Sequence, residues 1–417
     1  MARKAKVFNA YPFDYHQEIT VIIESLSNLG DGVAKIPVAA KEGEENQEER
    51  SWVLFVPFAL PGEKVRIKIW KNDKNCSHAD LEEVLEASPH RIEPRCTYFG
   101  TCGGCQYQHV SYDTQLIWKQ KQVADLLHHL AGVEHLVNDP LPSPQQWNYR
   151  SKITPHFQKP KNGKIRDIGF LRKGTRQSLI DIKQCDIAMD AINETFPIAR
   201  EGAHQRASSY KKGATLLLRA NEERVYDNPR EIMTEQVGEL SFSFLAGDFF
   251  QNNPFILTDF VDYACKQAVT GSTYLIDAYC GSGLFGLSLA KHFQEVSMVE
   301  VSDTGADWAR YNAKANKIDN AKILTASAEH IFDQITYPSE ETTILIDPPR
   351  KGCNEEFLQQ LFTFGPTRVI YISCNPATQA RDLKFFAEEN YNIIDVQPVD
   401  LFPQTRHLEC IVTLTKG

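Results

Sequence analysis

Short runs of β-branched and aromatic residues, separated by turn residues, dominate the first part of the chain. These strand-like runs are Glu18–Ile23, Gly32–Ile36, Trp52–Phe55 and Lys64–Ile69. Leu60-Pro61-Gly62-Glu63 precedes the last of them, and its proline fixes one φ angle while its glycine permits another, as a tight turn requires. Five or so short strands in about 70 residues are typical of a small barrel, so we predict a β-barrel domain over residues 15–87.

The middle of the chain mixes two periodicities. Apolar residues recur at helical spacing over residues 115–131, and alternating runs follow. These runs predict strands at Tyr149–Phe157, Asp167–Arg172, Ser178–Ile182 and Ala214–Arg219. We therefore predict a central α+β domain over residues 88–250.

The last third of the chain alternates apolar strands with helical stretches. The predicted strands are Tyr274–Ala278, Val296–Val301, Lys322–Thr325, Thr343–Ile346, Arg368–Ile372, Tyr391–Val399 and Leu408–Thr415. This pattern is typical of a doubly wound parallel sheet. Only a loop of about eight residues, Asp400 to His407, joins the last two strands, so we expect them to pair antiparallel. Such a closing strand predicts a Rossmann-like class I methyltransferase domain over residues 251–417 rather than a plain dinucleotide-binding domain, within a multidomain α/β protein.

Length and composition agree with a cytoplasmic globular protein. A chain of 417 residues predicts two or three domains, and 42% apolar with 24% charged residues is ordinary. No apolar run is long enough for a membrane span, and the N-terminus shows no secretory signal. In the reducing cytoplasm the ten cysteines are expected to be ligands, nucleophiles or packing residues.

The net charge of −9 argues weakly against a nucleic-acid partner. Part of the negative excess lies in one charged insertion, residues 41–50, which we interpret as a solvated loop. Because binding needs only a local basic face, the total charge does not exclude RNA. Such a face is predicted around the central strands, where the basic residues Arg150, Lys152, Arg172, Lys173 and Arg176 are expected to contact phosphates or form an ordinary solvated surface.

A glycine-rich turn follows the first strand of the last domain. It reads Asp277-Ala278-Tyr279-Cys280-Gly281-Ser282-Gly283-Leu284-Phe285-Gly286 and precedes a helix. Gly281 allows a tight turn, and Gly283 is expected to let a ligand approach the backbone. Glu300 ends the next strand, where a carboxylate can bind ribose hydroxyls. The pattern alone favours NAD and S-adenosylmethionine equally, and leaves a turn without a ligand as a structural alternative.

Three more chemical groups are predicted at the ends of strands in this domain. Asp347-Pro348-Pro349-Arg350 ends the fourth strand and faces the ligand crevice, unless Asp347 is only a helix cap. Cys374 ends the fifth strand before a helix, whose positive end is expected to lower the pKa of its thiol; otherwise it is a packing residue. Glu409 follows the final loop, where a lone glutamate ordinarily faces solvent.

Four cysteines are candidates for a metal site. Cys96, Cys102 and Cys105 lie close together among glycines, and Cys185 is distant. A zinc site is usually built from two pairs of cysteines two residues apart, and only one such pair is present, which favours an iron–sulfur cluster over zinc. The remaining cysteines, Cys76, Cys265, Cys280, Cys353 and Cys410, have no partners at ligand spacing and are interpreted as ordinary.

Taken together, these motifs resemble the S-adenosylmethionine-dependent RNA 5-methyluridine (uracil-5) methyltransferases over nearly the whole chain. Residues 373–383 are similar to the nucleophile motif of that family, 401–409 to its general-base motif, and 249–253 to a segment that contacts cofactor and target base. The N-terminal β domain resembles a TRAM domain, an RNA-binding barrel. The resemblance implies a 4Fe-4S cluster held by Cys96, Cys102, Cys105 and Cys185.

The resemblance also implies a role for each site residue. Cys374 is implied to be the nucleophile and Glu409 the proton acceptor. The implied ligands of S-adenosylmethionine are Gln251, Tyr279, Glu300 and Asp347. Of Phe249 and Phe250, one is expected to stack on the target base and the other to pack in the core. The chain departs from the family at Leu284, where asparagine is frequent, and at Arg406, where glycine is frequent.

We therefore expect a monomeric cytoplasmic RNA methyltransferase that binds neither DNA nor membranes. The TRAM domain and cluster resemble members that act on 23S ribosomal RNA, and relatives with both features that act on transfer RNA are the alternative. A dehydrogenase would leave Cys374 and Glu409 without a role, and a non-catalytic RNA-binding protein would not need them.

Overall fold

The computed structural model describes residues 8–39, 49–332 and 334–417 and divides into two compact units. The smaller unit contains the chain up to Trp118 together with Gln404–Arg406, and the larger contains Lys119–Pro403 and His407–Gly417. Most of the charged insertion at 41–50 lies outside the described residues, so its predicted loop stays a prediction, as do the three domain boundaries drawn from the sequence. Within the described ranges, no helix is both long and apolar enough to cross a membrane.

The smaller unit contains a six-stranded sheet with the strand order β1-β5-β6-β4-β3-β2. The strands are β1 (Glu18–Ile22), β2 (Ser25–Leu26), β3 (Asp31–Val38), β4 (Arg50–Pro57), β5 (Lys64–Asn72) and β6 (Cys76–Glu86). The four predicted strands are present, and their inward positions, such as Leu54 and Ile67, form a buried core. The long strand β6 was not predicted, because its many glutamate residues obscure the alternation that marks a strand.

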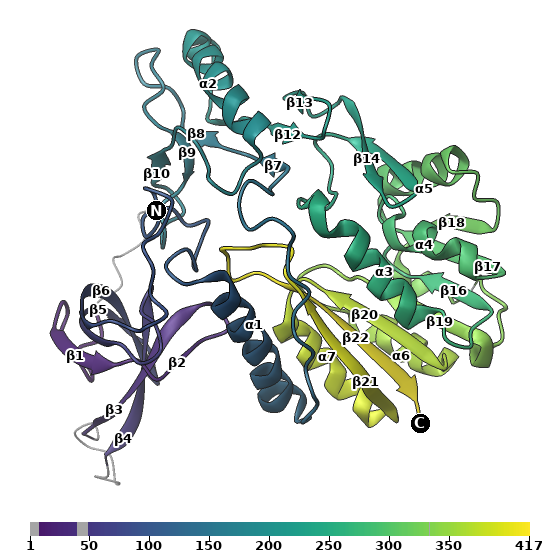
Figure 1. Ribbon diagram of the computed structural model, residues 1–417, viewed down its shortest axis with the longest axis horizontal. Helices are drawn as coiled ribbons and strands as arrows, with labels where there is room; N and C mark the ends of the chain where they lie inside the picture. Colours follow the sequence, from purple (N-terminus) through teal and green to yellow (C-terminus); the bar gives the residue numbers. More distant parts are fainter. Residues whose placement is uncertain (1–7, 40–48, 333) are drawn as a thin grey trace, which may run out of the picture. The chain divides into compact units, whose positions relative to one another are not determined.

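Two helices and several short strands come next along the chain, and the first of these helices begins in the smaller unit and continues into the larger (Figure 1). Helix α1 (Tyr112–Leu126) ends in a π-helical turn (Leu127–Ala131), and α2 covers Asp190–Gln205. The short strands are β7 (Lys152–Ile153), β8 (His156–Phe157), β9 (Ile168–Leu171), β10 (Leu179–Asp181), β11 (Ala214–Thr215), β12 (Leu218–Ala220) and β13 (Val225–Tyr226). They are followed by the hairpin β14 (Ile232–Val237) and β15 (Leu240–Leu245). The predicted strand Tyr149–Phe157 is two strands because Pro155 lacks the N–H that a ladder needs.

A seven-stranded sheet forms the rest of the larger unit, in the order β18-β17-β16-β19-β20-β22-β21. Its strands are β16 (Tyr274–Asp277), β17 (Glu295–Glu300), β18 (Ala321–Thr325), β19 (Thr342–Ile346), β20 (Arg368–Ser373), β21 (Tyr391–Val399) and β22 (Glu409–Lys416). The first five run parallel, whereas β22 pairs antiparallel with both β20 and β21. The predicted antiparallel pairing of the last two strands is confirmed.

Helices cover both faces of this sheet (Figure 1). One apolar cluster includes residues of α3 (Leu257–Ala268), α4 (Leu284–Leu289) and α5 (Asp303–Ala315). The other includes residues of α6 (Glu355–Phe364) and α7 (Pro376–Glu388). Neighbouring residues of one strand, such as Leu275 and Ile276, belong to different clusters, because successive side chains point to opposite faces. Both faces of the sheet are thus buried, so a ligand can reach the sheet at its edges and at the ends of its strands.

Candidate active site

A cavity of about 660 Å³ lies at the carboxyl ends of the parallel strands in the larger unit. Loops after β16, β17, β19 and β20 line it, together with residues 249–251 and the first residue of β22. The structure brings all six predicted site residues to this one cavity: Gln251, Tyr279, Glu300, Asp347, Cys374 and Glu409. The volume is in the range typical of sites for small molecules and cofactors.

The glycine turn after β16 is shaped by two left-handed residues. Gly281 has a φ of 54° and Gly283 a φ of 98°, a region that side-chain-bearing residues rarely adopt. A Cβ on Gly283 would lie 2.7 Å from a side-chain carbon of Leu287. The absence of a side chain at Gly283 is therefore required for packing against Leu287, and its predicted role in ligand approach stays a prediction; nothing lies within 4 Å of a Cβ on Gly281.

Glu300 is held in place by backbone donors. One carboxylate oxygen accepts the N–H of Gly281 at 2.9 Å and the other accepts the N–H of Ser302 at 2.8 Å. Each carboxylate oxygen can accept more than one hydrogen bond, so both can still accept from a ligand hydroxyl. The geometry is suited to orienting a ribose against the glycine turn.

Asp277, at the end of β16, stabilises the same turn through a hydrogen bond to its backbone. It is fully buried, and its Oδ2 accepts the N–H of Gly286 at 2.9 Å. Burial raises the pKa of Asp277 to about 7, against the opposing effect of its backbone hydrogen bonds. No role was predicted for Asp277, although its place at the end of a strand was a signal visible in the sequence.

Two carboxyl groups inside the cavity, the buried Glu409 and the half-buried Asp347, repel each other. Glu409 is only 4% exposed, so the expectation that a glutamate here ordinarily faces solvent is wrong. Burial, followed by the charge of Asp347, raises the pKa of Glu409 well above its usual value, with Arg350 opposing. Burial and the charge of Asp277 raise the pKa of Asp347 to about 7. Both groups therefore bind a proton much more readily than ordinary carboxyl groups.

The predicted lowering of the pKa of Cys374 is wrong. Burial, followed by the charges of Glu409 and Asp347, raises the pKa of this thiol to about 11. The positive end of α7 is present as expected, but desolvation and two nearby carboxylates disfavour the thiolate more strongly. Arg350 acts in the opposite direction through its charge and a side-chain hydrogen bond.

Arg350 is therefore a site residue to which no role was assigned from the sequence. Its carbonyl oxygen accepts hydrogen bonds from the Asn375 side chain at 3.0 Å and the Thr378 hydroxyl at 3.2 Å. These contacts join the loop after β19 to the start of α7. The signal was available in the sequence, because Arg350 directly follows the Asp-Pro-Pro segment.

The two phenylalanines before Gln251 have different environments. Phe249 is 78% exposed although it lines the cavity, whereas Phe250 is 4% exposed. The Phe250 ring stacks on that of Phe244 with centroids 4.3 Å apart. The expectation that one of the two packs in the core is confirmed for Phe250, and Phe249 is the ring available to a ligand.

Two basic side chains hold the segment that leads to these rings. The buried guanidinium of Arg219 donates to the carbonyl oxygens of Ala246 and Asp248, and lies over the Phe244 ring at 4.5 Å. Lys152 donates to the carbonyl oxygens of Gly247 and Asp248, both at 2.9 Å. The Lys152 ammonium is therefore directed to protein carbonyls, which disfavours its predicted phosphate contact.

Of the other basic residues predicted to contact phosphates, Arg150 is hydrogen-bonded to the protein and two arginines are exposed. Arg150 donates from Nε to the carbonyl oxygen of Lys152, whereas Arg172 and Arg176 are exposed. Arg406, the residue that departs from the family pattern, donates to the carbonyl oxygen of Leu29 at 3.4 Å within the smaller unit. Phosphate contacts by the exposed arginines stay a prediction.

Three of the predicted cluster ligands lie on the loop between β6 and α1. Cys96, Cys102 and Cys105 are all half-buried, and the turn between the first two is closed by a hydrogen bond from the Cys102 N–H to the Tyr98 carbonyl at 2.8 Å. Gly100, with a φ of 80°, allows that turn. This donor set suits an iron–sulfur cluster, since thiolates are its usual ligands. The fourth ligand, Cys185, belongs to the larger unit, and its part in a cluster stays a prediction of the sequence.

Comparisons with known proteins identify the family to which the chain belongs. Residues 189–417 match the family model described as tRNA (Uracil-5-)-methyltransferase, and residues 16–81 match the TRAM domain. The tRNA (uracil(54)-C(5))-methyltransferase of Schizosaccharomyces pombe is 41% identical over 97% of this chain and 79% of its own length. Its counterpart in Saccharomyces cerevisiae is 35% identical over 96% of this chain and 74% of its own length.

A bacterial relative and a solved structure extend the comparison. An uncharacterized RNA methyltransferase of Halalkalibacterium halodurans is 31% identical over 97% of this chain and 98% of its own length. The crystal structure of Pyrococcus abyssi tRNA (uracil-54, C5)-methyltransferase in complex with S-adenosyl-L-homocysteine has the same fold, with a TM-score of 0.71, 22% identity and coverage of 95% of this chain and 99% of that chain. Because the family model covers more than half of the chain and three relatives exceed 30% identity over nearly all of it, the chain belongs to the tRNA (uracil-5-)-methyltransferase family of S-adenosylmethionine-dependent RNA methyltransferases and carries a TRAM domain.

Proposed function

We propose that this protein methylates carbon 5 of a uridine in transfer RNA, with Cys374 as nucleophile and Glu409 as general base. The observation that carries the proposal is that a thiol, a buried glutamate and the predicted cofactor ligands line one cavity. The choice of transfer RNA is supported by the two fungal relatives, whose names specify uracil 54 of transfer RNA. The 23S ribosomal RNA predicted from the architecture is the other substrate that the test must include.

The proposed cofactor fits the described cavity. Glu300 is oriented to accept hydrogen bonds from ribose hydroxyls, and Gln251, Tyr279 and Asp347 are proposed as the other ligands of S-adenosylmethionine. Leu284, in place of the frequent asparagine, offers an apolar contact, since it is buried at the cavity wall. When bound, S-adenosylmethionine supplies the electrophilic methyl group that carbon 5 of the activated uracil attacks.

Cys374 performs the activation of the uracil. Carbon 5 is a poor nucleophile, but a bond between the Cys374 sulfur and carbon 6 shifts an electron pair toward carbon 5 and makes it enolate-like. The thiolate is the reactive form, and Arg350 favours it against the two carboxyl groups that raise the pKa of Cys374. Protonation of Asp347 or Glu409 removes part of that repulsion, so the protonation of all three groups is coupled.

Glu409 completes the reaction after the methyl group has been transferred. Its carboxylate takes the proton from carbon 5, the electron pair of that C–H bond restores the 5,6 double bond, and the sulfur–carbon 6 bond breaks. Cys374 leaves as the thiolate, and the product is 5-methyluridine. A glutamate whose pKa is raised by burial is a stronger base than an ordinary carboxylate, which suits this step.

The target uridine has to leave its stack to reach Cys374. Phe249 is exposed at the cavity and is proposed to stack on the extruded base, a contact typically contributing about 1–3 kcal/mol. Phe250 is buried against Phe244 and is not available for that role.

A methyl-transfer assay tests this proposal. The purified protein is incubated with tritium-labelled S-adenosylmethionine and either unmodified transfer RNA or 23S ribosomal RNA fragments. We expect label as 5-methyluridine in transfer RNA, loss of label with Cys374→Ala, and normal labelling with the matched control Cys265→Ser, whose thiol lies away from the cavity. Labelling of the 23S fragments alone would overturn the transfer-RNA proposal, and labelling that survives Cys374→Ala would overturn the role of the thiol.

A second variant tests the general base independently. In Glu409→Gln the thiol can still add to carbon 6, but no carboxylate removes the proton from carbon 5. We expect a protein–RNA adduct that persists in denaturing gels and disappears in the double variant with Cys374→Ala. Full turnover by Glu409→Gln would show that another group removes the proton.

We also propose that Cys96, Cys102, Cys105 and Cys185 hold a 4Fe-4S cluster with a structural role, since methyl transfer needs no redox step. Protein purified without oxygen is expected to be brown and to contain about four irons per chain. Cys102→Ser is expected to lose the colour together with stability or RNA affinity. Colourless, iron-free protein would contradict the cluster, and unchanged folding and affinity in Cys102→Ser would contradict its structural role.

A further inference from the structure

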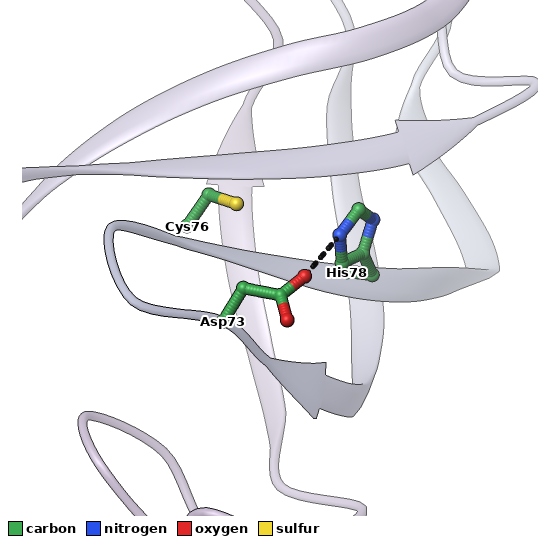
Figure 2. A group of neighbouring side chains, drawn as sticks. All are labelled: Asp73, Cys76 and His78. Atoms are coloured by element: carbon green, nitrogen blue, oxygen red, sulfur yellow. Dashed lines mark hydrogen bonds and ion pairs between the residues drawn. The ribbon is translucent and has the colours of Figure 1, made fainter.

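The hairpin between β5 and β6 carries three metal-ligating side chains far in sequence from the active-site motifs. Asp73 lies in its turn, Cys76 is the first residue of β6 and His78 follows two positions later. Because alternate residues of a strand point to the same face, Cys76 and His78 share one face of β6. One ligand atom from each of the three residues lies within 4.8 Å of the others, and the side chains point toward one another (Figure 2).

The backbone that carries these ligands is fixed by contacts on the opposite face of the hairpin. The Trp52 indole donates to the Ser77 hydroxyl at 2.8 Å, and that hydroxyl donates to the Asn72 side chain at 2.6 Å. The N–H of Asp73 donates to the carbonyl oxygen of Cys76 at 2.8 Å, which closes the turn. The ligand positions are therefore set by the protein fold itself, as a preorganised site requires.

The imidazole of His78 is oriented from three directions. Its ring lies 5.5 Å from both the Phe55 and the Trp70 rings, measured between centroids. Its Nε2 lies 3.1 Å from Oδ2 of Asp73. This arrangement limits rotation of the ring and keeps a nitrogen directed at the carboxylate.

We propose that Asp73, Cys76 and His78 bind a zinc ion. Thiolate, imidazole and carboxylate are the three ligand types that zinc accepts, and a site with three protein ligands leaves a fourth position for water. The zinc ion would join the turn of the hairpin to β6 and restrict the end of the sheet. Calcium and magnesium are disfavoured, because they prefer sites made entirely of oxygen ligands.

Lys71 is the natural competitor for this site. Its ammonium pairs with the Asp73 carboxylate, and its side chain is 44% exposed, so it can move into solvent when zinc arrives. Binding therefore exchanges one cation for another at Asp73 and releases the proton of Cys76. Removing the ammonium is expected to tighten zinc binding, a result that a simple surface ion pair would not produce.

Alkylation of individual cysteines tests the proposal in the full-length protein, despite its nine other cysteines. The protein is treated with N-ethylmaleimide with and without zinc chloride, and each cysteine peptide is quantified by mass spectrometry. We expect zinc to slow the alkylation of Cys76 at least tenfold and to leave Cys265, the internal control, unchanged. His78→Ala and Asp73→Asn are each expected to raise the zinc concentration needed for protection at least tenfold, and Lys71→Met to lower it.

Two results would overturn the zinc site. One is alkylation of Cys76 at the same rate with and without zinc. The other is protection that is unchanged in both His78→Ala and Asp73→Asn, which would mean that the thiol binds zinc without a site around it. Circular dichroism of each variant shows whether the fold is retained, and Asp73→Asn is a small enough change to keep the test informative if His78→Ala unfolds.

Discussion

Lys119 and Asp400 form a fully buried ion pair in the larger unit, and Lys119→Met is expected to destabilise that unit strongly. The ammonium donates to Oδ1 of Asp400 at 2.7 Å and to the carbonyl oxygen of Phe402 at 3.3 Å, and both charged side chains have no exposed surface. The same Oδ1 accepts the N–H of Phe402 at 3.2 Å. The pair therefore holds the beginning of the loop that leads to β22 and Glu409.

The size of the destabilisation depends on the buried charge that remains after Lys119 is replaced. Methionine fills much of the lysine volume, but the Asp400 carboxylate remains buried without its cation, which typically costs about 3–5 kcal/mol. For a domain of this size, about 2 °C of melting temperature corresponds to each kcal/mol, so we expect a loss of about 6–10 °C. Asp400→Asn in the same chain removes the orphaned charge but keeps an oxygen that can accept from Phe402.

Thermal unfolding followed by circular dichroism, at one pH and salt concentration for all variants, measures the effect. The double variant Lys119→Met with Asp400→Asn is expected to recover most of the lost melting temperature, because two neutral side chains of similar volume carry no desolvation cost for charges. The reasoning is refuted if Lys119→Met melts within 2 °C of the parent, or if the double variant is no more stable than Lys119→Met alone.

Three further predictions follow from the site and its surroundings. Because the pKa of Cys374 is raised to about 11, the rate at which iodoacetamide alkylates it, measured on the peptide that contains it, should still be increasing at pH 10. Glu409→Gln should shift this rate–pH profile to lower pH, and an unchanged profile would contradict the repulsion between Glu409 and the Cys374 thiolate. Gly283→Ala should destabilise the protein by about 1–3 kcal/mol in urea unfolding and weaken S-adenosylmethionine binding. The reasons are that a φ of 98° is strained for alanine and that the new Cβ would approach Leu287, and wild-type stability and affinity would exclude both effects. Glu235 is a buried residue of β14, and burial raises its folded-state pKa to about 7. Its contribution to stability is therefore fully present below pH 4.5 and is lost as the pH rises through 7, so Glu235→Gln should flatten that part of the stability–pH curve. An unaltered slope would show that Glu235 does not contribute to it.

The arrangement of the seven-stranded sheet could be predicted because its strands are short apolar runs buried on both faces. A loop too short for a helix between β21 and β22 sufficed to predict their antiparallel pairing. The grouping of Asp347 and Cys374 was predictable for a related reason, since parallel strands end at the same edge of a sheet. These conclusions depend on local sequence and on the few connections that sheets allow.

The electrostatics of the site could not be predicted in the same way. The pKa of Cys374 depends on Glu409 and Asp347, which lie 35 and 27 positions away in the chain, and on the burial of all three. The helix that follows Cys374 led to the wrong direction for the shift of its pKa. The opposing effect is desolvation of the thiol, which depends on tertiary packing and cannot be predicted from the local sequence. The grouping of Cys76 with Asp73 and His78 was missed for another reason: only cysteine partners were considered, although a histidine two positions away in a strand shares its face.

Every residue that lines the cavity lies between positions 249 and 409 and belongs to the larger unit. The TRAM domain, at residues 16–81, belongs to the other unit. Mutations in the TRAM domain can therefore accumulate without replacing any residue that lines the cavity. In evolutionary terms, the two units can therefore vary independently, since a substitution within residues 16–81 replaces none of the side chains that line the cavity.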